Sequence, residues 1–121
     1  MEMSNISSVI QNAEIRVELE RQDTICVRVG LTVPSSQPWK FNIVKAKLFH
    51  GDVQYAAQGE NELHGCTNAT KLTFRFNGKE VIPESKFVLF YREPDSGVCK
   101  LCTWILTGGE WVLEKNLMRS D

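Results

Sequence analysis

Apolar and polar residues alternate at every second position, and this feature of the sequence most constrains its fold. In the segment 13–20, Ile15, Val17 and Leu19 alternate with charged residues, and the segment 25–31 repeats the pattern. A period of two matches a β-strand with one buried face, whose successive side chains point to opposite sides. The chain is therefore expected to fold mainly as half-buried strands.

Turn signals separate the alternating runs, and two local patterns are specific. Asn77-Gly78 directly follows the run 71–76 and predicts a type I′ hairpin turn, with 79–82 as the return strand. The segment 86–91 is apolar on both faces, which predicts a central strand covered on two sides. The expected strands are 13–20, 25–31, 42–49, 53–58, 71–76, 79–82, 86–91, 99–107 and 110–114.

This spacing of short strands and turns predicts one all-β domain, a single-domain antiparallel β-sandwich of about seven to nine short strands. The sandwich is expected over 13–114, after an N-terminal arm or short helix at 1–12 and before a flexible C-terminal tail at 115–121. A chain of 121 residues with 42% hydrophobic content is long enough to bury one core without disulfide or metal support.

Charge and the absence of a long apolar run exclude several classes of protein. The formal net charge is -1, so the long-range field that attracts nucleic acid or an anionic membrane is missing. No segment approaches the roughly 20 consecutive apolar residues of a spanning helix, and the N-terminus lacks the pattern of a secretory signal. We therefore expect a cytoplasmic protein that binds neither nucleic acid nor membrane.

The four cysteines allow two interpretations. With no secretory signal, Cys26, Cys66, Cys99 and Cys102 are expected to be reduced thiols that pack as small hydrophobic residues in the core. Cys99 and Cys102 have half of a zinc-binding spacing, and an alternative zinc site would add Cys66 and His64. Residues three apart in a continuous strand point to opposite faces, which argues against the alternative.

The motifs of common enzymes are missing. The sequence contains no Gly-x-Ser-x-Gly nucleophile elbow, no phosphate-binding glycine loop and no His-Glu-x-x-His pattern. We therefore expect no enzymatic activity and no cofactor.

Two segments interrupt the alternation and are expected to be loops that carry function. The segment 33–39 contains Pro34 and Pro38, which would hold a large aromatic side chain in a fixed position. The segment 59–67 is polar and lies between two predicted strands. The candidate binding residues are Trp39, Lys40, Gln37, Asn61 and His64.

The sequence thus predicts a non-enzymatic protein-protein interaction module, such as an adaptor, a regulatory subunit or a virus-encoded factor acting on host proteins. It would bind through loops at one end of the sandwich or through an edge strand. The alternatives are a carbohydrate-binding module with an exposed aromatic loop and a zinc-stabilised β domain. A homodimer through an edge strand is also expected, with 53–58 a better edge than 13–20, because Glu14, Glu18 and Glu20 would repel a symmetric copy.

Overall fold

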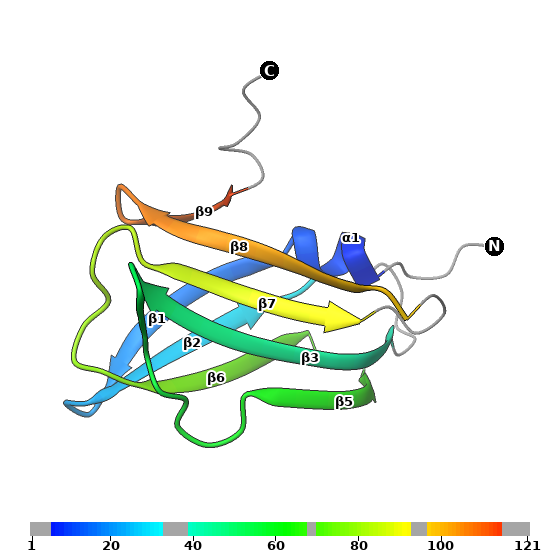
Figure 1. The fold of residues 1–121 in the computed structure, drawn as a ribbon, viewed down its shortest axis with the longest axis horizontal. Helices are drawn as coiled ribbons and strands as arrows, with labels where there is room; N and C mark the ends of the chain where they lie inside the picture. The colour runs from blue at the N-terminus through cyan, green and yellow to red at the C-terminus, as the bar shows by residue number, and fades with distance from the viewer. Residues whose placement is uncertain (1–5, 33–38, 68–69, 93–96, 115–121) are drawn as a thin grey trace.

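The protein is an all-β sandwich, as the sequence predicts. The computed structural model describes residues 6–32, 39–67, 70–92 and 97–114, in which two antiparallel sheets pack face to face (Figure 1). The smaller one, called the small sheet below, has the order β1-β2-β6. Its strands are β1 (Glu14–Glu20), β2 (Thr24–Gly30) and β6 (Lys71–Asn77).

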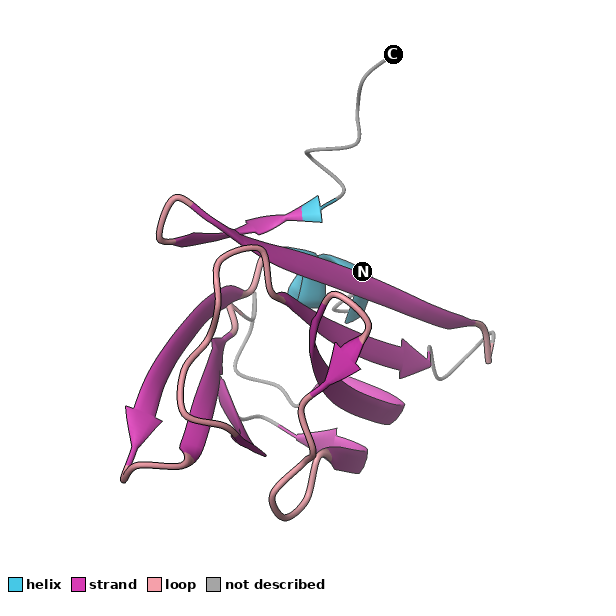
Figure 2. Cartoon of the chain, turned by 60° about the vertical axis from the view of Figure 1, so that its left-hand side comes forward, coloured by secondary structure: helices cyan, strands magenta, loops and turns pink. Residues whose placement is uncertain are grey.

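The second sheet, called the large sheet, has twice as many strands. Its order is β4-β3-β7-β8-β9, and β5 also pairs with β3. The strands are β3 (Trp39–His50), β4 (Val53–Gln54), β5 (Glu62–Thr67), β7 (Lys86–Arg92), β8 (Cys99–Thr107) and β9 (Glu110–Leu113). One short helix, α1 (Ile6–Gln11), precedes β1 and places Val9 and Ile10 in the core. Figure 2 shows the two layers from another side.

The core lies between the two sheets and is centred on aromatic rings. The ring of Phe87 lies 6.2 Å from Phe74, 6.5 Å from Phe76 and 6.2 Å from Trp104, measured between ring centroids. Tilted and edge-on contacts at this distance are favourable for aromatic pairs. The strands β6, β7 and β8 are therefore fixed against each other at the middle of the sandwich.

Two loop predictions are wrong because strand pairing extends further than the local sequence indicates. Residues 62–67 form β5, and β3 begins at Trp39 rather than at Asn42. The two segments pair with each other as antiparallel strands. A strand of an antiparallel sheet can carry polar residues on a solvated face, so polarity alone does not mark a loop.

The predicted central position of β7 is confirmed, and its outer face is covered in part, since Val88 on that face is buried. β7 lies between β3 and β8. In the described part of the chain no third layer covers its outer face. The side chain of Phe90 on that face is half-buried, and the Lys47 ammonium lies 5.3 Å from its ring centroid.

Among the described residues, no helix has the length and apolar character needed to span a membrane.

The predicted type I′ hairpin at Asn77-Gly78 is also wrong. Residues 79–82 form no strand, and Gly78 does not have a positive φ. Its amide donates a hydrogen bond to the Asp23 carbonyl (2.9 Å), which prolongs the pairing of β6 with β2 beyond Thr24 and Asn77. A Cβ at this position would lie 2.6 Å from Ile25 Cδ1 and 3.0 Å from the Tyr55 ring. Gly78 is needed for close packing and not for its conformational freedom.

Gly78→Ala is expected to lower the free energy of unfolding by about 1–3 kcal/mol, because the added Cβ would force the fully buried Ile25 side chain to shift. Gly30→Ala is the control, since its Cβ would meet nothing closer than 3.8 Å. Urea unfolding of both variants measures the difference. An equal, small effect of the two substitutions would contradict the packing explanation.

The outer face of the small sheet carries a network of ion pairs that covers a buried thiol. Arg75 of β6 donates two hydrogen bonds to Glu20 of β1, at 2.8 Å and 3.3 Å. Arg28 of β2 lies 3.1 Å from Glu18 and 3.7 Å from Glu20. Cys26, directly beneath, is fully buried. The network therefore ties β1 to β6 across β2.

This network predicts a pH dependence of stability. The hydrogen bond from Arg75 holds the pKa of Glu20 below its ordinary value of 4.5, against an opposing effect of desolvation. A lowered pKa stabilises the fold above the unfolded-state pKa, and this contribution is lost as the pH falls through the folded-state pKa. Arg75→Ala should therefore destabilise the protein at neutral pH, and the difference from wild type should shrink in acid.

Chemical unfolding over a pH series measures this effect. Arg16→Ala is the matched control, because Arg16 pairs with Glu14 at 3.4 Å where both side chains are more than two thirds exposed. Such exposed pairs contribute little. A difference between wild type and Arg75→Ala that is independent of pH would contradict the assigned role of Glu20.

Candidate binding groove

Side chains on the inner face of β1 become steadily more exposed along the strand. Ile15 is buried, Val17 is partly buried, and Leu19 is 53% exposed. The residues paired with them on β2 are fully buried: Val29, Val27 and Ile25. The inner face of the small sheet thus loses its cover at β1, towards the end of the strand.

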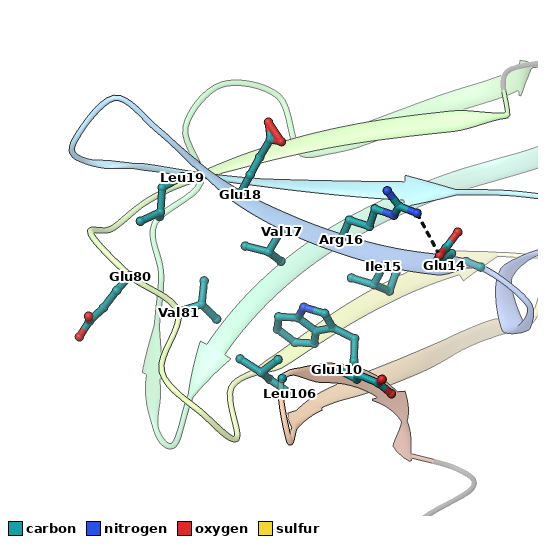
Figure 3. Close-up of a pocket in the computed structure, with 13 residues that line it drawn as sticks. Glu14, Ile15, Arg16, Val17, Glu18, Leu19, Glu80, Val81, Leu106 and Glu110 are labelled. Carbon is teal, nitrogen blue, oxygen red and sulfur yellow. Dashed lines mark hydrogen bonds and ion pairs between the residues drawn. The ribbon is translucent and has the colours of Figure 1, made fainter.

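An open groove of about 1060 Å³ lies along this part of β1. Its apolar residues come from β1, from the segment after β6 and from the β8–β9 hairpin. Figure 3 shows Ile15, Val17 and Leu19 pointing from β1 towards Val81 and Leu106. Trp111 of β9 also lines the groove. A volume of this size is at the upper end of the range for ligand sites, but an open groove suits a chain segment better than a small molecule.

The groove exists because one side of the sandwich is open. β1 pairs only with β2 and β9 only with β8, so both are edge strands within the described residues. An edge strand presents N–H and C=O groups that have no partner in its sheet. The groove therefore combines an apolar floor with a free strand edge.

The opposite side of the sandwich is closed by the segment 55–58. The Tyr55 amide donates to the Leu48 carbonyl (2.9 Å), and the Gln58 amide donates to the Arg75 carbonyl (2.8 Å). The amide of Asn77 donates to this segment as well, at Ala56 (2.8 Å). Of the predicted edge 53–58, β4 is an edge strand of the large sheet, while 55–58 is bonded to β3 and β6. Its use in a homodimer stays a prediction.

Carboxylates dominate the charged lining of the groove. Glu14, Glu18, Glu80 and Glu110 line it, against Arg16 as the one basic side chain. Glu14 is 3.4 Å from Arg16, and Glu18 is 3.1 Å from Arg28. Among the described residues, Glu80 and Glu110 form no ion pair. Four negative charges and one positive charge give the groove an excess of three negative charges, in a chain whose total is -1.

The residues predicted for binding from the sequence lie elsewhere. Trp39 and Lys40 begin β3 opposite Thr67 and Cys66 of β5, and His64 pairs with Ile43. The two segments expected to be separate loops are therefore neighbours, as paired strands. The side chains of Trp39, Lys40 and His64, and all of Gln37, lie outside the described residues.

Asn61, the fifth predicted binding residue, has a structural contact. Its side-chain amide donates to the Ala46 carbonyl (2.8 Å), and the Ala46 amide donates to the Asn61 carbonyl (3.0 Å). The pair of bonds fixes the start of β5 against β3. Asn61 is therefore engaged within the fold rather than directed at a ligand.

The cysteines do not converge on one point. Cys99 is exposed and Cys102 is buried, as expected for residues on opposite faces of β8. The prediction of core packing holds for Cys102 and is wrong for Cys99, while Cys26 is buried on the outer face of the small sheet beneath the ion pairs. His64 and Cys99 lie in one row across the large sheet, with β3 and β7 between them. Three strand spacings of about 4.8 Å separate their backbones by about 14 Å. This distance does not favour the alternative zinc site of His64, Cys66, Cys99 and Cys102, since zinc bonds are about 2.0–2.3 Å long.

The sequence prediction missed the groove because local patterns do not show which strand ends a sheet. The alternation in 13–20 correctly identifies the inner side chains of β1. It does not show that, among the described residues, the small sheet ends at β1. The sequence did contain one sign of the groove. In the two strands that border it, β1 and β9, three of the four groove carboxylates stand next to apolar residues: Glu14, Glu18 and Glu110.

Comparison with protein-family models, curated proteins and solved structures finds no match. We therefore infer function from the geometry and charge of this chain.

The exposure gradient along β1 predicts unequal effects of truncating two paired residues. Leu19→Ala should change the free energy of unfolding by less than about 0.5 kcal/mol, because Leu19 is largely exposed. Ile25→Ala, at its partner on β2, should cost about 2–5 kcal/mol, because Ile25 is fully buried. Urea unfolding measures both. Similar losses in the two variants would mean that the groove is closed in solution.

Proposed function

We propose that this protein is a non-enzymatic interaction module that binds an extended segment of a partner protein along β1. The observation that carries the proposal is the coincidence of a free strand edge with inner apolar side chains that become more exposed along β1, from partly buried Val17 to largely exposed Leu19. Each feature alone is common at a protein surface. Together they supply the two components of strand addition, which are backbone hydrogen bonds and pockets for alternate side chains.

The dimensions of β1 suit such a partner. Its seven residues span about 24 Å at roughly 3.4 Å per residue. The groove is lined by β1 over its length from Glu14 to Leu19. A partner strand placed here would become the fourth strand of the small sheet and would cover Val17, Leu106 and Trp111.

The edge of β1 is also unprotected against strand addition. Natural edge strands are blocked by proline, bulges or inward-pointing charges. β1 contains no proline and pairs with β2 in regular register from Glu14 to Glu20, and its inward residues are apolar. Its charged residues lie on the outer face, where they leave the edge itself accessible.

The other functions predicted from the sequence gain no support from the described residues. A carbohydrate site would depend on the Trp39 side chain, which lies outside them. The zinc-stabilised alternative has its expected ligands spread across the large sheet. Homodimerisation and a cytoplasmic location stay predictions.

A random peptide library displayed on phage tests the proposal. Peptides enriched on the wild-type protein are expected to bind Leu19→Asp at least about tenfold more weakly, because a buried carboxylate in the groove is unfavourable. Val53→Asp is the matched control: Val53 is 65% exposed, on the edge strand β4 at the closed side. It should bind the same peptides as the wild type does.

Circular dichroism and unfolding curves must first show that both variants fold. The proposal fails if the enriched peptides bind Leu19→Asp as tightly as they bind the wild type. It also fails if Val53→Asp weakens peptide binding as much as Leu19→Asp does.

A further inference from the structure

The groove also indicates the chemistry of its partner, an inference that rests on the proposed function. We infer that the bound segment is an extended strand in which apolar residues alternate with polar ones, with Lys or Arg at two polar positions four residues apart. These two basic residues would face Glu14 and Glu18. The inference follows from the register of β1 and from the charges around the groove.

The alternation follows from strand geometry. Side chains of a strand added to β1 would point alternately into the groove and to the outer face of the small sheet. Positions level with Ile15, Val17 and Leu19 would enter the groove, where Val81 and Leu106 form the opposite wall (Figure 3). These positions require apolar side chains, because a polar group buried there without a partner is unfavourable.

The basic residues follow from the outer face of β1. Glu14, Arg16 and Glu18 occupy its successive outward positions. A partner residue directly opposite Glu14 or Glu18 is favoured if it is basic, and the residue between them, opposite Arg16, is favoured if it is neutral or acidic. The pattern is the same in both chain directions, so it applies to parallel and antiparallel addition.

The rim of the groove adds to this preference. In the view of Figure 3, Glu80 lies towards Leu19 and Glu110 lies towards Glu14. Neither forms an ion pair with another described residue, and both line the groove. Both carboxylates add to the negative field around the groove, which favours fast association of a basic strand.

A second copy of this chain is a poorer occupant. Symmetric antiparallel pairing of two β1 strands centred on Arg16 would place Arg16 opposite itself and Glu14 opposite Glu18. Pairing centred on Val17 would bring Arg16 opposite Glu18 but Glu14 opposite Glu20. Each copy also adds a strand with three carboxylates and one guanidinium to a groove that is already acidic.

Three labelled peptides test the inference by fluorescence anisotropy on the intact protein. The basic peptide is Val-Lys-Val-Thr-Val-Lys-Val, and its charge-reversed counterpart is Val-Glu-Val-Thr-Val-Glu-Val. The third peptide has the composition of the basic one without alternation, Lys-Lys-Thr-Val-Val-Val-Val. All three are capped at both ends. The basic alternating peptide is expected to bind at least about tenfold more tightly than either control, with an affinity that falls as salt is added.

A charge swap on the protein sharpens the test. In the double variant Glu14→Lys, Glu18→Lys, the preference is expected to reverse, so that the charge-reversed peptide binds more tightly than the basic one. Both glutamates lie on the outer face of an edge strand with exposed side chains, at 71% and 55%, so the variant should fold. A reversal cannot result from partial unfolding, which would weaken both peptides.

The outcomes separate the inference from the proposed function. If library peptides depend on Leu19 but the basic and charge-reversed peptides bind equally, the partner chemistry is wrong and strand addition at β1 still holds. If library peptides are insensitive to Leu19→Asp, the proposed function itself fails. A dimer in sedimentation that Leu19→Asp converts to a monomer would overturn the inference in favour of a second copy.

Discussion

The unequal width of the two sheets is the constraint on which the rest of the structure depends. Three strands of the small sheet face a large sheet whose main path has five. The rings around Phe87 fix the centre of the sandwich, so the large sheet extends past the small one at the sides. On one side the segment 55–58 closes the gap between the sheets through backbone hydrogen bonds to β3 and β6. On the other side no described segment closes this gap, and Leu19 is left largely exposed.

An edge strand without inner cover needs another source of stability, and the outer face of the small sheet supplies one. The Glu20 carboxylate at the end of β1 accepts two hydrogen bonds from Arg75 on β6, across the intervening β2. Charge-assisted, two-point contacts of this kind hold geometry better than single ion pairs. They hold β1 in place at the end where Leu19 packs least. The strand can therefore stay ordered while its free edge and inner face are available to a partner.

The sequence predicts the fold class and most strands because alternation is a local signal that follows directly from the buried face. The sequence predicts local structure less well where contacts between distant segments determine it. Gly78 has the local pattern of a hairpin turn, but its role is to let Ile25 and Tyr55 approach. The groove follows from the strand order, which no local pattern contains. Leu19 has the same alternating context as Ile15, and the local pattern does not show that Ile15 is covered while Leu19 is left largely exposed.

Native-state hydrogen exchange with and without the basic alternating peptide tests the central claim most directly, because it reports the free edge itself. In the free protein, alternate amides of β1 should exchange fast while those bonded to β2 stay protected. Saturation with the peptide should protect the fast β1 amides and leave β4 unchanged. Protection of every β1 amide in the free protein, or peptide-induced protection confined to other strands, would contradict an open edge at β1.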